Sequence, residues 1–154
     1  MKLKASKYDI AANLLCLLML LGITVYLIIS WSSIPDKIPG HYNAAGEVDR
    51  WGGKSELLFL PVLGWLLYIG ITLLERFPQV WNTGVAVTVE NKERVYRILK
   101  NMIGTLKIMT VAIFTSLTIN TAFAKALPVF FLPLILLLMF GFIIFFMIRL
   151  NRSK

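Results

Sequence analysis

The sequence predicts an all-α integral membrane protein with four transmembrane helices, and three observations support this fold class. Hydrophobic residues make up 58% of the 154 residues and charged residues only 16%, whereas soluble domains carry about 25% charged residues. Four stretches are long and apolar enough to cross a bilayer, because about 20 residues span its hydrocarbon core. Basic residues gather in alternate connecting segments, as in multi-pass membrane proteins. We therefore treat residues 1–154 as a single membrane domain.

The four predicted spans account for most of the chain. The first follows three lysines and is longer than a signal-peptide core of about 7 to 15 residues, so we expect it to stay uncleaved. The third contains Lys107, whose long side chain is expected to reach the nearby headgroups; the alternative is a functional role inside the membrane. The fourth is rich in phenylalanine and is expected to face lipid. The spans cover about residues 10–34, 57–74, 102–124 and 126–148.

The distribution of basic residues predicts the topology. The segments before the first span, between the second and third, and after the fourth hold three, five and three of the 16 Lys and Arg residues. The positive-inside rule then places both termini in the cytoplasm. The lipid bilayer is the partner that this charge implies. Nucleic acid is not expected as a partner, because there is no basic folded domain to bind it.

The segment 35–56, between the first two spans, is predicted to form a structured outer cap. Pro35 ends the first helix because proline lacks an amide hydrogen, and Pro39 repeats the effect four residues later. Glycines such as Gly46 permit tight turns. Irregular backbone cannot lie unsatisfied in lipid, so the cap is expected at the outer interface or against protein.

The single histidine, His41, lies in this cap and is the candidate for chemistry, because four polar or acidic residues lie within a few positions of it. Three roles are open: a bond to the loop backbone, the binding of a peptide, lipid headgroup or ion, and catalysis. The sequence has one cysteine and no HExxH, CxxC, GxSxG or phosphate-loop pattern. A closed zinc site draws several His or Cys ligands, so a metal site is left open and no cofactor is expected. The neighbouring residues are Asp36, Asn43, Glu47 and Asp49.

The segment 75–100, between the second and third spans, is predicted to be an inner loop. Pro78 and the triplet 82–84 break regular structure, and residues 85–89 are expected to be extended. From Glu90 onward the pattern predicts an amphipathic helix that runs into the third span. Its basic residues are expected near lipid phosphates and its aliphatic residues in the interface: Arg94, Arg97 and Lys100, and Val95, Ile98 and Leu99.

Many residues of the cap stand at fixed spacing within twenty positions, in the pattern Pro35-x-x-Ile38-Pro39-x-His41-Tyr42-Asn43-x-x-Gly46-x-x-Asp49-x-Trp51-Gly52-x-Lys54. This pattern resembles the signature of a bacterial membrane-domain family of unknown function. That domain also forms the first part of SdpI-like proteins, the membrane immunity and signal-relay proteins of a sporulation-delaying toxin system. The inner loop adds to the resemblance, which covers about residues 10–122, with Phe77-Pro78, Asn82 and Thr88-x-Glu90-Asn91-x-x-Arg94-x-Tyr96.

The resemblance implies a bundle of membrane helices in the cytoplasmic (inner) membrane of a bacterium, with the motif loop on the outer face. SdpI-like immunity proteins have a further membrane portion after this domain. Because this sequence ends after its fourth span, we expect the shared fold rather than the whole immunity activity. The resemblance marks His41, Asn43, Gly46, Asp49 and Lys54 as binding candidates, Pro35 and Pro39 as structural residues, and Asn82, Glu90, Asn91, Arg94 and Tyr96 as the cytoplasmic-loop set.

The sequence thus favours a non-enzymatic binding or sensing module whose outer cap receives an extracellular peptide or an envelope component. By the resemblance, such binding would serve toxin immunity or signal relay. Two alternatives stay open. One is a metal-dependent or histidine-based envelope enzyme that uses His41. The other is a small oligomeric transporter in which Lys107 and Asn120 line a route. The sequence leaves open which molecule binds and whether the chain assembles with copies of itself or with another membrane protein.

Overall fold

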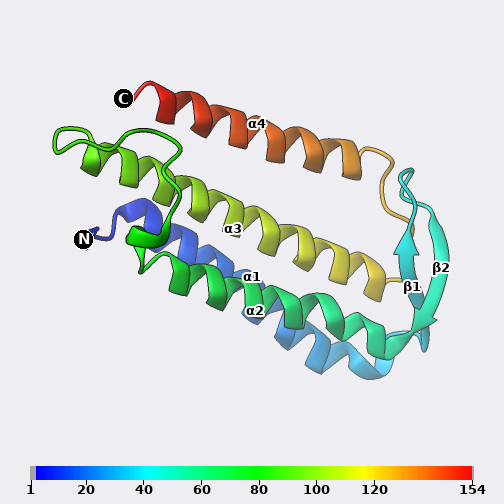
Figure 1. The fold of residues 1–154 in the computed structure, drawn as a ribbon. Coiled ribbons are helices and arrows are strands. Elements are labelled where there is room, and N and C mark those ends of the chain that lie inside the picture. The colour runs from blue at the N-terminus through cyan, green and yellow to red at the C-terminus, as the bar shows by residue number, and fades with distance from the viewer. Residues whose placement is uncertain (1–2, 154) are drawn as a thin grey trace.

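The computed structural model describes residues 3–153 and is mostly helical, with four long helices side by side and a small β hairpin at one end (Figure 1). Both described ends of the chain lie at the opposite end of the bundle (Figure 1). All four helices are long and apolar enough to cross a membrane, counting with α2 the short 3-10 helix that precedes it. This indicates a multi-pass membrane protein. The helices are α1 (Lys7–Ser30), α2 (Phe59–Leu74), α3 (Lys92–Ala122) and α4 (Phe131–Asn151).

The expectation of an all-α chain is wrong between residues 37 and 53. Strands β1 (Lys37–Tyr42) and β2 (Val48–Gly53) form a two-stranded antiparallel sheet, with irregular register between Pro39 and Tyr42. A proline is tolerated there because each strand of a two-stranded sheet is an edge, and an edge strand need not donate every amide. Pro39 and Gly40 in β1 and the two glycines at the end of β2 also hide the two-residue alternation by which a strand is normally recognised.

The first helix begins three residues earlier than predicted and ends before Pro35. Ser6 caps it: the Ser6 hydroxyl accepts from the Asp9 amide, and the Asp9 carboxylate accepts from the Ser6 amide. This reciprocal arrangement satisfies donors that the first turn leaves unpaired. A short 3-10 helix, Trp31–Ser33, completes the span.

The predicted amphipathic helix and third span form one continuous helix, α3, which begins ten residues before the predicted span. The connecting loop is therefore 75–91 rather than 75–100. The predicted placement of Val95, Ile98 and Leu99 in the lipid interface is wrong, because all three are buried in the protein. Arg97 and Lys100 do not extend to phosphates either: both approach the carboxylate of Asp9, at 2.9 and 3.2 Å.

The fourth helix begins at Phe131, five residues later than predicted. The linker before it is held by the hairpin, since the Leu127 amide donates to the Gly46 carbonyl at 2.8 Å. Ala124, just after α3, adopts a left-handed φ of 52° that ends that helix.

Helix α3 is the centre of the bundle and packs against α1, α2 and α4. The buried apolar residues form one cluster near the hairpin and one at mid-bundle. Helix α4 is the outlying member: among its residues only Phe146 is buried. Helices α2 and α4 lie on opposite sides of α3 (Figure 1).

Lys107 does not extend to the headgroups, so that prediction is wrong. Its side chain is 0% exposed, and its Nζ donates to Glu75 Oε2 at 2.9 Å, Asn13 Oδ1 at 2.8 Å and Thr72 Oγ1 at 3.3 Å. These partners come from α1 and from the end of α2. A buried ammonium needs such partners because leaving water is costly for a charge. The lysine thus joins three helices.

Candidate functional site

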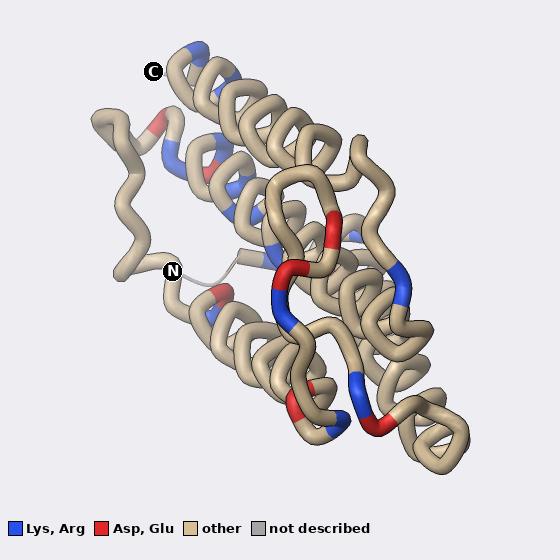
Figure 2. Tube along the Cα trace, turned by 90° about the vertical axis from the view of Figure 1, so that its right-hand side faces the viewer, with Lys and Arg blue, Asp and Glu red and all other residues tan. Residues whose placement is uncertain are grey.

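Most of the residues predicted for the outer-cap site lie on the hairpin or its turn. His41 is on β1, Asp49 on β2, and Asn43 and Gly46 are in the connecting turn. Lys54 follows β2 at the start of the short 3-10 helix Lys54–Leu58. Viewed from the hairpin end, Lys, Arg, Asp and Glu positions of both signs follow one another along the hairpin and the segment after it (Figure 2).

His41 and Asp49 form an exposed pair across the two strands. Asp49 Oδ1 lies 2.6 Å from His41 Nδ1, and the side chains are 44% and 64% exposed. An ionised carboxylate can only accept, so Nδ1 carries the proton and donates it. The Nε2 atom of His41 is then available to a ligand. This pair was not specified by the sequence, in which Asp36 and Glu47 lay as close to the histidine.

Asn43 and Gly46 build the turn of the hairpin. The Asn43 side-chain oxygen accepts from the amides of Ala45 and Glu47, and its Nδ2 donates to the Glu47 carboxylate. Gly46 has φ +84°, a conformation that side chains rarely adopt. A Cβ at this glycine would lie 2.5 Å from the Leu127 carbonyl oxygen. Both residues therefore shape the turn and its contact with the α3–α4 linker.

Lys54 lies apart from His41 and joins the hairpin to the end of α1. Its Nζ donates to the Ile34 carbonyl at 2.8 Å and lies 5.0 Å from the centre of the Trp31 ring. Its amide donates to the Asp36 carbonyl. The structure therefore gives Lys54 a positioning role. Of the two structural prolines, Pro35 is exposed and Pro39 is buried.

Tyr42 anchors the hairpin on α3 and the linker after it. Its hydroxyl is 3.2 Å from Thr121 Oγ1, donates to the Lys125 carbonyl at 3.1 Å and accepts from Asn120 Nδ2 at 3.2 Å. Asn120 is thus at the hairpin end of α3, where it also donates to the Lys125 carbonyl. Lys107 makes its contacts with Asn13, Thr72 and Glu75 instead, so the structure does not bring Asn120 and Lys107 together.

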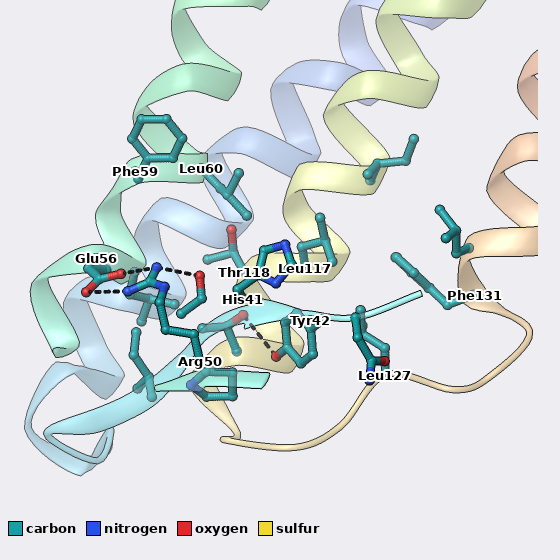
Figure 3. A pocket seen from close by; sticks show the side chains of 18 of the residues that line it. His41, Tyr42, Arg50, Glu56, Phe59, Leu60, Leu117, Thr118, Leu127 and Phe131 are labelled. Atoms are coloured by element: carbon teal, nitrogen blue, oxygen red, sulfur yellow. Dashed lines mark hydrogen bonds and ion pairs between the residues drawn. The ribbon is translucent and has the colours of Figure 1, made fainter. Parts of the chain in front are cut away.

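Arg50 anchors the hairpin on the short 3-10 helix Lys54–Leu58 that precedes α2. Its guanidinium donates to both carboxylate oxygens of Glu56, at 3.3 and 2.8 Å, and to the Gly40 carbonyl at 2.7 Å (Figure 3). The hydrogen bond to Glu56 raises the pKa of Arg50 above its ordinary value. The same bond lowers the pKa of Glu56, so the ion pair persists between the lowered pKa of the acid and the raised pKa of the base, which includes the neutral range. Gly40 leaves room for this guanidinium: a Cβ there would lie 2.7 Å from the guanidinium carbon, so the Arg50 side chain would have to shift.

A crevice of about 1080 Å³ lies beneath the hairpin. Its roof is β1 and the turn, including His41, with Arg50 and Glu56 beside it; its walls are the facing sides of α2, α3 and α4 (Figure 3). The walls are mainly aliphatic and aromatic: Phe59 and Leu60 of α2, Leu117 of α3, and Phe131 and Ile135 of α4 are representative. The hairpin is therefore the polar cover of an apolar groove.

The cytoplasmic-loop candidates lie at the opposite end of the bundle, and several of them are structural. Asn91 is buried; its Oδ1 accepts from the Thr88 amide, and the Thr88 hydroxyl accepts from the Asn91 amide. The Asn82 side chain accepts from the Gly84 amide, and the ring of Tyr96 lies 6.0 Å from that of Trp81. Glu90 and Arg94 are exposed.

The arrangement of the side chains gives no support for a metal site in the described residues. Within residues 3–153, no three His, Cys, Asp or Glu side chains are placed to hold a metal ion together. The groups that sequence reasoning did not select are the two anchors, Tyr42 and the Arg50–Glu56 pair. Tyr42 is not identified by spacing, because its partners lie 78 to 83 residues away in the chain. Arg50 and Glu56 are close in the chain, but nothing in their spacing marks them as a pair that holds the hairpin.

Comparisons with known proteins match the segment that carries the hairpin. A family model described as "Domain of unknown function (DUF1648)" matches residues 18–64, from within α1 to the first turns of α2. An uncharacterized protein of Archaeoglobus fulgidus is 33% identical over 66 residues, which are 38% of this chain and 36% of the relative. The chain thus spans little more than a third of that relative's length. No solved structure matches the chain. The similarity is therefore to a segment whose function is unknown.

Proposed function

We propose that the chain is a non-enzymatic protein of a bacterial cytoplasmic membrane, with both termini inside and the hairpin outside, whose hairpin end binds an envelope component or an extracellular peptide. The orientation is supported by the basic residues, which gather in the terminal segments and between residues 76 and 100, where one lies in the connecting loop and four lie in the first turns of α3. Both described ends of the chain lie opposite the hairpin (Figure 1).

The observation that carries this proposal is the crevice under the hairpin. Binding sites are concave, mostly apolar and furnished with a few fixed polar groups. The crevice has this character: its walls are apolar, and His41 and Arg50 stand at one end. The hairpin is fixed over it by the bonds of Tyr42 to α3 and of Arg50 to the short 3-10 helix before α2, so the polar groups are already in place before a ligand arrives.

A finer version of the proposal follows from the resemblance to SdpI-like proteins. In this version, occupation of the crevice would protect the cell from a toxin or be relayed to the cytoplasmic side. The exposed Arg94 of the cytoplasmic end would be available to a partner there. The family match over residues 18–64 is to a domain of unknown function, so this version depends on the sequence resemblance alone.

Photo-crosslinking in growing cells tests the proposal. Benzoylphenylalanine at Ala44, which lines the crevice, is expected to capture one molecule of defined mass. The matched control is Ala45, the exposed neighbour outside the crevice. His41→Ala should reduce the Ala44 adduct while the amount of protein in the membrane stays the same. Identical adducts at the two positions, unaffected by His41→Ala, would contradict a binding site beneath the hairpin.

A further inference from the structure

The crevice changes in polarity along its length. Arg50, Glu56 and His41 lie at its hairpin end, whereas its walls farther along the helices are apolar. The two threonines of the α3 wall add little polarity: Thr118 donates to the Phe114 carbonyl, and Thr121 lies against the Tyr42 hydroxyl. A molecule that matches this lining has a polar head and an apolar tail.

The crevice lies between α2 and α4, which are on opposite sides of α3 (Figure 1). Both flanking helices present exposed apolar side chains beside it, Phe59 on α2 and Leu132 on α4. If these helices span a bilayer, this side of the crevice adjoins hydrocarbon. A lipid tail reaches it by lateral diffusion, whereas a water-soluble peptide would have to carry unsatisfied backbone groups through hydrocarbon.

The polar end offers hydrogen-bond donors. A guanidinium has five N–H groups, and the three bonds from Arg50 to Glu56 and Gly40 leave its Nε and one Nη1 hydrogen for a ligand. Phosphate and ester oxygens are acceptors for these N–H groups. His41 donates through Nδ1 to Asp49, so its Nε2 is an acceptor and can take a hydrogen bond from a hydroxyl or ammonium group of a lipid head. Arg50 already faces a carboxylate, so recognition depends on its free N–H donors rather than on net positive charge.

We infer that the crevice holds one phospholipid of the surrounding bilayer, with an acyl chain between α2 and α4, the phosphate and ester oxygens at Arg50, and a donor group of the lipid head at His41. The inference rests on the proposed function in taking the crevice as the ligand site. The volume of about 1080 Å³ is just above that of most ligand pockets, which measure about 300–1,000 Å³. A transmembrane helix from a second copy fits less well, because its apolar length would leave the free donors of Arg50 and the Nε2 acceptor of His41 unpaired.

The tail site is tested with the full chain in detergent micelles, with palmitoyl-oleoyl-phosphatidylglycerol as the added probe. Native mass spectrometry should show one lipid that survives washing in the wild-type protein. Leu117→Trp fills the crevice and should lower retention by at least about tenfold. Leu134→Trp is the matched control, because Leu134 is exposed on α4 and does not line the crevice. Ile135→Trp, on the opposite wall, replaces Leu117→Trp if that variant does not fold.

The head site is tested with Arg50→Gln, which should weaken retention, against Lys37→Gln, an exposed position on β1 outside the crevice. Palmitoyl-oleoyl-phosphatidylethanolamine should be retained within about tenfold of phosphatidylglycerol, because the site has paired charges. Equal retention by wild type and by folded Leu117→Trp and Ile135→Trp variants would overturn the inference. If no phospholipid is retained but Ala44 still captures a discrete non-lipid molecule, the lipid inference fails and the binding function stands. If neither is seen, both fail.

Discussion

The Nζ atom of Lys107, on α3, lies 2.9 Å from Oε2 of Glu75, just after α2, and the lysine side chain is completely buried. Asn13 of α1 and Thr72 of α2 supply the other two hydrogen bonds. Three helices are therefore held together by one polar cluster near the end of the bundle that is opposite the hairpin. The fold depends on both members of the pair, because each buried charge would be left without a counter-charge if the other were removed.

Removing one partner of this pair should be strongly destabilising. Lys107→Met leaves the Glu75 carboxylate, which is 9% exposed, without its cation, and breaking a buried pair costs about 3–5 kcal/mol. The double variant Lys107→Met/Glu75→Leu should recover most of that loss, because neither charge is then buried alone. Thermal unfolding of the purified variants in one detergent measures both effects. A Lys107→Met variant as stable as the wild type would contradict the buried ion pair between Lys107 and Glu75.

Gly46→Ala should loosen the hairpin from the linker that precedes α4. The glycine has φ +84°, and a methyl group would collide with the Leu127 carbonyl; a non-glycine residue forced into such a conformation costs about 1–3 kcal/mol. The matched control is Gly53→Ala in β2, where an added Cβ meets nothing within 4 Å. Amide hydrogen exchange at Leu127, which donates to the Gly46 carbonyl, should quicken in the first variant and not in the second. Equal exchange in the two variants would contradict the contact.

Much of the fold was predictable because hydropathy alone identifies apolar stretches of spanning length. Four helices are present where four were predicted, although their ends differ because caps and linkers depend on particular contacts, such as that of Ser6 with Asp9. The hairpin was not predicted, since its strands contain proline and glycine and lack clear alternation. Local turn signals were informative: Asn43 and Gly46 do form the turn.

The candidate site could be predicted only in its local part. His41, Asn43 and Asp49 lie within nine residues, so the turn brings them near one another. The crevice depends instead on how α2 and α4 pack against α3, and no pattern in the sequence specifies that packing. Lys107 was misjudged for the same reason: Glu75 and Asn13 are 32 and 94 residues away in the chain.

Asn91→Ala should destabilise the start of α3 rather than affect binding at the hairpin. Asn91 and Thr88 exchange side-chain to backbone hydrogen bonds, and Asn91 Nδ2 also donates to the Ala86 carbonyl. These bonds tie the buried Asn91 side chain to the loop before the helix, and each net hydrogen bond lost costs about 0.5–1.5 kcal/mol. Glu90→Ala, at an exposed neighbouring position, is the control and should leave unfolding unchanged. If Asn91→Ala lowers phospholipid retention while its melting temperature stays that of the wild type, the structural role is wrong.

The proposed orientation predicts which end of the bundle a membrane-impermeant maleimide reaches in intact cells. Cys16 is the chain's single cysteine and is buried, so Cys16→Ser gives an unreactive background. In it, Ala45→Cys in the hairpin turn should be labelled from outside. Val89→Cys, in the loop at the other end and 97% exposed, should be labelled only after the membrane is permeabilised.

Both positions are exposed, so the comparison reports the side of the membrane rather than burial. The expectation rests on the electrostatic cost of moving loops rich in Lys and Arg across the membrane, which retains them in the cytoplasm. Lys92 and Arg94 follow Val89 closely, whereas the hairpin carries acids and bases together. Labelling of Val89→Cys from outside, with Ala45→Cys protected, would reverse the orientation. It would place the hairpin in the cytoplasm, where an extracellular peptide could not reach it.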